Sequence, residues 1–346
     1  DVGRLVNFIG RTNRAFQGGR INNTGFSSFD MPNFFNRVTA ITIEESWKLK
    51  GFFAKDMCYK TSQSDFKKTQ RFRPSGGTMW EGLDQDGKIK HGAFGEETSY
   101  ETSLDTKAQI VMFNRVIIKN DDFGAIREMI QLMLEGAEMV PDHKLVQHML
   151  QAPGAFFSAY AADTETGGNG TGNDYRNALA ALNETSLALA YDLASEQTIN
   201  KGKVNWLNDI GDNWTIVVAT RAMERVAWEL IEQSEFVSNT TANTKQTKKN
   251  YWYKRFNVRR FPQLANKTFN EWAKRDTWFL WPSESRYAPF AINWLDGIER
   301  PTVETVDAPV DMLGFGTRGY IDVEINDREP EAIVRMRPTA DSAGAD

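Results

Sequence analysis

The chain has 346 residues, enough for two domains or for one large domain with extensions. It carries 41 Lys and Arg against 46 Asp and Glu, so its formal net charge is −5 and it lacks the excess of cations that holds phosphate backbones. This balance argues against a nucleic acid as a tightly bound partner, and the 12% of aromatic residues argues against a disordered chain.

The first 29 residues have the composition of an extended arm rather than of a helix or strand. They contain Gly, Asn and Ser with scattered apolar residues, and they show no sustained hydrophobic period. Four arginines stand against one acid, a local side-chain balance of 4 − 1 = +3 that favours contact with acidic surfaces. These arginines are Arg4, Arg11, Arg14 and Arg20.

Residues 60–99 form a second segment with little capacity for a core. Gly76-Gly77 and Asp86-Gly87 supply turn chemistry between polar arms, which predicts a long two-stranded hairpin. An excursion of about 40 residues without its own core is hard to explain in a monomer, so we expect other copies of the chain to cover its aromatic side chains. The aromatic residues expected at contacts between subunits are Phe66, Phe72, Trp80 and Phe94.

A buried strand and a long helix are expected next. The segment from Tyr100 to Asn120 alternates and then becomes continuously apolar, a pattern typical of a strand that enters a buried sheet. Residues 120–122 can cap a helix, and apolar residues then recur at spacings of three and four. Pro141 should kink or end that helix, with a further helical piece reaching Leu150.

The remainder predicts a mixed architecture. A second helix follows a glycine-rich loop and has an apolar stripe from Ala178 to Leu193. A short buried strand from Trp214 to Ala219 runs into a helix capped by Thr220, and the sequence beyond residue 250 is rich in strands. Because the sequence shows neither an internal repeat nor a regular alternation of strand and helix, the predicted fold class is α+β.

The sequence offers little material for catalysis or metal binding. Residues 167–173 (GGNGTGN) resemble a phosphate-binding loop but lack its Lys-Ser/Thr ending and a preceding buried strand, which favours a flexible connection. His143 and His148 are five residues apart, not the four that align two imidazoles, and Cys58, the only cysteine, has no flanking motif. We expect no catalytic residue, no cofactor, no metal and no membrane partner.

Four segments carry a resemblance by their order along the chain. The first is a strand with Asn-Asp-Asp before a long helix, the second an apolar strand with an Ala-containing helix, the third Trp-Phe-Leu followed by a Gly and a Pro, and the fourth a closing strand pair with an acidic turn. They are residues 100–124, 214–231, 276–301 and 319–338. Together they resemble the tailed-bacteriophage major capsid proteins of the Hong-Kong-type shell fold, and within these the Mu-like major head subunit family.

The resemblance implies a phage major capsid fold with six parts. These are an N-terminal arm, a connection, an extended hairpin loop, a peripheral domain with a long spine helix, an axial domain, and a return to the peripheral domain with the C-terminal tail. In order, the parts are residues 1–29, 30–59, 60–99, 100–165, 166–315 and 316–346.

The function implied by the resemblance is structural and not enzymatic. The chain would self-assemble into hexamers and pentamers of an icosahedral head, in the cytoplasm of a bacterial host, and the virion would hold double-stranded DNA without specific contacts. Other implied partners are a decoration or cement protein, the portal, and a scaffold or prohead protease. Two alternatives stay open: an encapsulin-like shell with a protein cargo, and a nucleotide-dependent enzyme that uses residues 167–173.

The resemblance also bears on maturation. Relatives are commonly made with an upstream segment that is cut away, so we expect Asp1 to be a new N-terminus and the arm to become ordered on assembly. Some relatives join a hairpin lysine to a neighbour's asparagine, which requires a desolvated lysine beside a positioned acid. We expect no such cross-link here, because the hairpin lysines stand among polar residues. They are Lys67, Lys68, Lys88 and Lys90.

Overall fold

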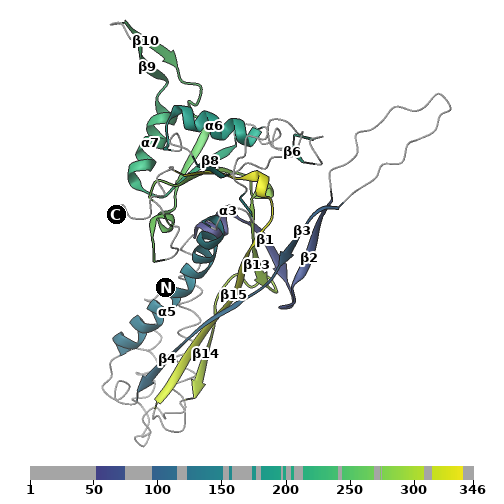
Figure 1. The fold of residues 1–346 in the computed structure, drawn as a ribbon. Helices are drawn as coiled ribbons and strands as arrows, with labels where there is room; N and C mark the ends of the chain where they lie inside the picture. Colours follow the sequence, from purple (N-terminus) through teal and green to yellow (C-terminus); the bar gives the residue numbers. More distant parts are fainter. Residues whose placement is uncertain are drawn as a thin grey trace, which may run out of the picture.

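The computed structural model shows a long helix lying along one sheet, with a second sheet at one end of both (Figure 1), and it confirms the predicted α+β class. The described residues are 52–74, 96–114, 123–150, 156–157, 174–176, 181–195, 198–199, 204–205, 213–240, 244–268, 273, 275–307 and 314–337. Several predicted contact residues and the glycine loop lie outside this set: Arg4, Arg11, Arg14, Arg20, Trp80, Phe94 and residues 167–173.

The first sheet is built around the long strand β15 (Gly314–Asp327). In its first part β15 lies between β4 and β14, and in its second part it pairs with β13, always antiparallel. Strand β1 pairs with β13 in parallel, so the sheet takes in residues 59–63, which include the start of the segment that we expected to be a hairpin loop. The partner strands are β1 (Tyr59–Gln63), β4 (Thr106–Asn114), β13 (Phe290–Leu295) and β14 (Thr302–Asp307).

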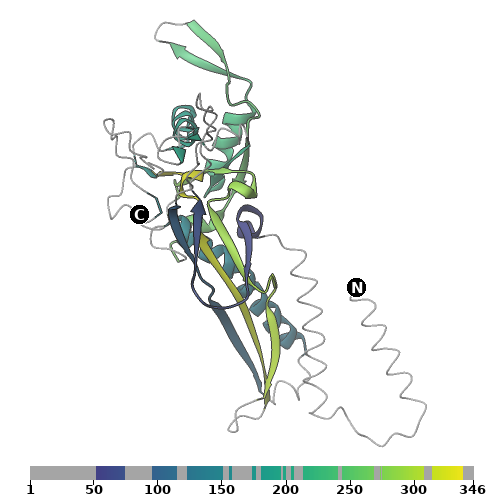
Figure 2. The same cartoon turned by 90° about the vertical axis from the view of Figure 1, so that its right-hand side faces the viewer.

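Helix α5 (Phe123–Met149) runs along this sheet, as Figure 2 shows from the side. It approaches β15 closely at Gly319, where an added Cβ would lie 3.2 Å from Met133 Cε. Of the two alternatives predicted at Pro141, a kink or a helix end, the helix end is wrong, since α5 continues through this residue. The turn is buried, and the Asp142 carboxylate accepts the Ala54 amide of α3 (Phe53–Met57) at 2.9 Å, so tertiary packing offsets the missing backbone hydrogen bond.

The second sheet separates two hydrophobic cores. Its order is β11-β8-β12-β16-β5, and every residue of β8 is buried. Ile216 and Val218 pack with α6 and α7 on one face, whereas Val217 packs with α3 and the end of α5 on the other. The elements are β5 (Asp174–Arg176), α6 (Glu184–Ser195), β8 (Trp214–Val218), α7 (Arg221–Glu232), β11 (Phe256–Arg260), β12 (Trp278–Pro282) and β16 (Val334–Arg337).

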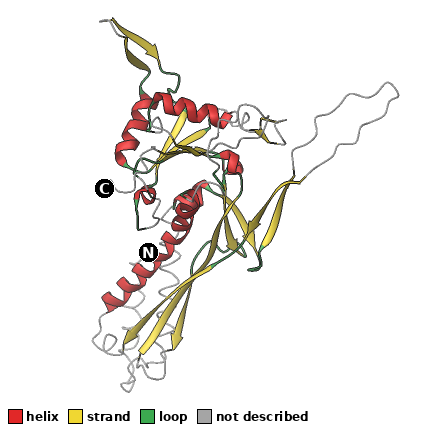
Figure 3. Cartoon of the chain, in the orientation of Figure 1, coloured by secondary structure: helices red, strands yellow, loops and turns green. Residues whose placement is uncertain are grey.

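Three two-stranded antiparallel pairs complete the described strands (Figure 3). The pairs β2–β3 and β9–β10 stand out from the two sheets, and β6–β7 is much shorter. Their bounds are β2 (Thr69–Pro74), β3 (Glu96–Thr102), β6 (Thr198–Ile199), β7 (Val204–Asn205), β9 (Glu235–Thr240) and β10 (Thr244–Lys249). Short 3-10 helices are η3 (Pro262–Ala265), η4 (Ser285–Tyr287) and η5 (Pro330–Ala332).

Helix α6 begins later than the apolar stripe from Ala178 suggested. The Asn183 side chain accepts the Ser186 amide at 2.8 Å, and the Ser186 hydroxyl accepts the Asn183 amide at 3.0 Å. This reciprocal cap fixes the first helical residue at Glu184. Leu182 therefore joins the core from the preceding turn and not from the helix.

The start of α7 confirms the predicted cap at Thr220, whose hydroxyl accepts the Met223 amide at 3.4 Å. We expect Thr220→Ala to lower the free energy of unfolding by about 1 kcal/mol, because the amide loses this acceptor. Urea denaturation of the unassembled subunit measures the change. Thr220→Ser keeps the hydroxyl and should lose less, so equal losses for the two variants would contradict the prediction.

Candidate functional site

The antiparallel pair β2–β3 leaves the first sheet and extends away from the rest of the described chain (Figure 1). Phe66 lies in the turn that leads into it and is 52% exposed. Phe72 lies within β2, opposite Ser99 of β3. The two predicted contact residues that the structure describes therefore belong to the projection or to its foot, and the way in which the foot is held decides where the projection points.

Side chains from the first sheet hold the connection between β3 and β4, residues 103–105, which we call the elbow. Asn326 of β15 accepts the Ser103 amide at 3.0 Å, and its own amide group donates to the Ser103 carbonyl at 3.4 Å. Asn293 of β13 donates to the same carbonyl at 3.4 Å and to Gln63 Oε1 of β1 at 2.9 Å. Both asparagines are buried. Because buried amides are costly to leave unpaired, these contacts fix the backbone at the foot of the projection.

A buried lysine holds the same elbow from the helix side. Lys144 of α5 donates to Asp105 at 3.1 Å and to Glu324 of β15 at 2.6 Å. Its side chain is only 9% exposed, so the ion pairs are much less screened by water than surface pairs. Lys107 of β4 adds an exposed pair to Asp105 at 2.8 Å. The ion pairs thus tie the elbow to α5, β4 and β15.

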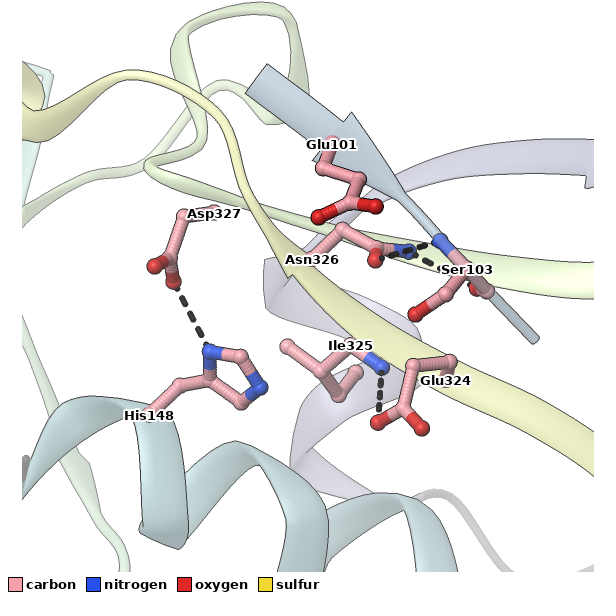
Figure 4. Close-up of a pocket in the computed structure, with 7 residues that line it drawn as sticks. All are labelled: Glu101, Ser103, His148, Glu324, Ile325, Asn326 and Asp327. Atoms are coloured by element: carbon pink, nitrogen blue, oxygen red, sulfur yellow. Dashed lines mark hydrogen bonds and ion pairs between the residues drawn. The ribbon is translucent and has the colours of Figure 1, made fainter. Parts of the chain in front are cut away.

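A cavity of about 360 Å³ opens beside the elbow (Figure 4). Its wall includes Glu101 of β3 and the pair formed by His148 Nδ1 and Asp327 Oδ1, 2.8 Å apart. The figure shows Asn326 and Ser103 side by side at one end of it and the His148–Asp327 pair at the other. The remaining lining residues are Glu324 and Ile325. The cavity marks the place where α5, β3 and β15 meet.

The Asp105 carboxylate gives this junction a dependence on pH. The hydrogen bond from Lys107, with help from Lys144, holds the pKa of Asp105 below its ordinary value, although partial burial opposes the shift. Since the folded-state pKa is lower than the unfolded one, Asp105 stabilises the fold above its ordinary pKa of about 4, and this contribution is lost as the pH falls through the folded value. Asp105 is half exposed, so the effect is modest.

We therefore expect the difference in unfolding free energy between the unassembled wild type and Asp105→Asn to shrink from pH 7 to pH 3. Urea titrations at several pH values measure it. A difference that stays constant over this range would show that the ionised carboxylate contributes nothing.

Cys58, His143 and His148 lie in the described part of the chain. Cys58 is buried, and desolvation, with the nearby Asp142 carboxylate, raises the pKa of its thiol far above the ordinary value. His148 pairs with Asp327, while His143 lies near Gln147 on α5. Within the described ranges, no group of His, Cys, Asp and Glu side chains is placed to hold a metal ion, and no helix is long and apolar enough to cross a membrane.

The elbow contacts were missed by the sequence prediction. Asn293 sits inside the apolar strand β13, Asn326 near the acidic end of β15, and Lys144 inside a helix. For Asn293 a polar residue at a buried position of an apolar strand was the available signal, because it needs a partner. The identity of that partner could not be predicted, since Ser103 lies about 190 or more residues away in sequence.

The comparisons give the following matches. A family model described as "Phage capsid protein" matches residues 97–336, well over half of the chain. A subunit of the bacteriophage PhiM1 mature capsid is similar with a TM-score of 0.51 and 11% identity, covering 84% of this chain and 89% of the other. The cyanophage P-SCSP1u capsid is similar with a TM-score of 0.49 and 10% identity, covering 84% of this chain and 88% of the other. A virus-like particle from Pyrococcus furiosus is similar with a TM-score of 0.47 and 7% identity, covering 88% of this chain and 99% of the other. No curated protein matches the chain.

Proposed function

Because the chain belongs to the phage capsid protein family, we propose that its copies assemble into hexamers and pentamers of an icosahedral head that encloses double-stranded DNA. The family match carries this proposal. The likeness to the PhiM1 subunit confirms the shell fold implied by the sequence resemblance. The family match shows that the chain is a capsid protein. The assignment to the Mu-like subfamily stays a prediction, as do the six part boundaries.

The described surface supports assembly. The β2–β3 projection has no second layer to pack on in the described chain, whereas a neighbouring subunit could cover it. Large apolar side chains also remain exposed on α5, on the first sheet and its connections, and on or near α7, which is typical of surfaces that meet other chains. They include Phe66, Ile110, Leu132, Met139, Trp228, Tyr251 and Ile298.

The proposal includes a place and partners for the shell. We infer assembly in the cytoplasm of a bacterial host, with a portal, a scaffold or prohead protease, and a decoration or cement protein as further contacts. The net charge of −5 supports a lining that lets DNA enter and leave without specific binding. The inferred role is structural, with no catalytic step assigned to the chain.

Electron microscopy of the purified full chain tests the proposal, together with its nucleic-acid content and its content of other proteins. We expect closed shells with hexameric and pentameric units, and DNA in particles isolated from infected cells. Shells that enclose a protein cargo instead of DNA would support the encapsulin-like alternative. Monodisperse subunits without particles under all assembly conditions would overturn the proposal.

Mature particles should dissociate completely in denaturant. The hairpin lysines lie among polar residues, and an isopeptide bond needs a desolvated lysine. On a denaturing gel this chain should therefore run as one band near 39.3 kDa, without covalent multimers. A ladder of covalent multimers would contradict this expectation.

A further inference from the structure

A shallow hollow of about 530 Å³ lies on the outer side of α7, next to the end of the edge strand β11. Trp228 is 41% exposed there, although α7 otherwise buries its apolar residues against the second sheet. The hollow is also lined by three arginines and one acid, which are Arg221, Arg225, Arg260 and Glu224. An exposed tryptophan among arginines is the composition of the energetic centre of a protein interface, so we call these five residues the α7 patch.

The charges of the α7 patch are only weakly satisfied within the chain. Arg260 lies 3.6 Å from Glu224, and Arg225 lies 3.8 Å from Glu229, both long for ion pairs. Arg221 is exposed and has no ion pair with any residue of the described chain. It is also the first residue of α7, where the partial positive charge of the helix terminus disfavours a cation. The stability of α7 therefore does not explain why an arginine stands at position 221.

The outer face of α6 shows the opposite arrangement. Thr185, Ala188, Leu189 and Asp192 follow one another at helical spacing and are exposed or half-buried. Helix α6 contains Glu184 and Asp192 but neither Lys nor Arg.

Asp192 lies in the last turn of α6, where the partial negative charge of the helix terminus disfavours an acid, and it has no ion pair within the described residues. Among the described residues, Arg221 and Asp192 are thus a cation and an anion without an ion pair, each at the unfavourable end of its helix.

Both helices cover the same face of the second sheet, with α7 on β11 and β8 and α6 on β16 (Figures 1 and 2). Two complementary surfaces at different places on one subunit make a head-to-tail contact, and repetition of such a contact around an axis closes a ring. Because subunits of a shell must meet in rings under the proposed function, a second copy of this chain is the occupant that fits the α7 patch.

We propose that the α7 patch of one subunit docks on the outer face of α6 of the next subunit in the same ring. In this contact Arg221 pairs with Asp192, and Trp228 packs on Ala188 and Leu189. The interface buries an aromatic anchor and brings together two charges that have no ion pair in the part of the subunit that the structure describes. The inference rests on the proposed self-assembly.

Charge exchange tests the pairing without harming the subunit. Arg221→Asp and Asp192→Arg each place the favourable charge at a helix end, so the purified subunits should melt no lower than the wild type. Each single variant should lower shell yield at least about tenfold, since like charges then meet at every ring contact. The double variant should restore the yield to within about twofold of the wild type, because the pair is rebuilt with reversed sign.

Matched variants complete the experiment. Arg221→Lys and Asp192→Glu keep the charges and should assemble as the wild type does, whereas Trp228→Ala should lower the yield at least about tenfold. Wild-type yield from either charge-reversed single variant, or no recovery in the double variant, would overturn the pairing. Failure of the wild type itself to form shells would overturn the proposed function instead, so the two failures are distinguishable.

Discussion

Replacement of residues 75–95 by a two-residue Asn-Gly turn is expected to abolish shell formation while the subunit still folds. Pro74 and Glu96 are paired across β2–β3, so a short turn can join them without disturbing the strands below. The elbow contacts begin only at Ser103, so the replacement leaves them in place. The loss should therefore fall on contacts between subunits.

Two measurements separate folding from assembly in this variant. The melting temperature of the unassembled subunit should stay within a few degrees of the wild type, while particles should be undetectable by electron microscopy. A variant in which the same residues are replaced by an equally long Gly-Ser segment serves as the matched control for length, and it should also fail to assemble. Normal shells from the shortened variant would show that residues 75–95 are dispensable for assembly.

Loss of Lys144 should have the largest effect on the stability of the subunit itself. Lys144→Ala leaves the Glu324 carboxylate, only 17% exposed, close to Asp105 with no buried cation between them. An uncompensated, largely buried charge costs several kcal/mol, and partial exposure of Asp105 reduces this, so we expect a loss of about 2–4 kcal/mol. Chemical denaturation of the unassembled subunit measures it.

Lys107 provides the matched control, because it binds the same Asp105 carboxylate from a position that is 55% exposed. Lys107→Ala should cost less than about 1 kcal/mol, as exposed ion pairs do. The double change Lys144→Met with Glu324→Gln removes both buried charges and should recover part of the loss. Equal effects of the Lys107 and Lys144 substitutions would refute a special role for the buried ion pair.

The sequence predicted best those elements that are determined by residues close together in the chain. The apolar run at 214–218, followed by Thr220, predicted both β8 and the first residue of α7, because burial and capping depend on neighbouring residues. The strand-rich C-terminal part and the long helix after residue 122 were predicted for the same reason. The projection at β2–β3 was predicted from glycine turns and a shortage of apolar residues, and its described strands agree with this.

The failures of prediction come from contacts between distant segments. Residues 59–63 look polar and were assigned to the connection and the hairpin loop, yet β13 draws them into a sheet from more than 200 residues away. Pro141 breaks an isolated helix, but here the buried turn packs on α3 and the helix continues. The elbow was not predicted, because its asparagines and Lys144 reveal their partners only in the folded chain.

Strand β15 also has a mechanical consequence. Its hydrogen bonds to β4, β14 and β13 run across the strand, so a pull along its axis loads many of them in shear at once instead of opening them in succession. Beyond Asp327 the chain continues through η5 directly into β16, inside the second sheet. The connection from β12 through η4 to β13 joins the same two sheets a second time, so tension between them is carried by strands that are hydrogen-bonded along their length, and a stretched subunit should yield by peeling at its edges before it extends along its length.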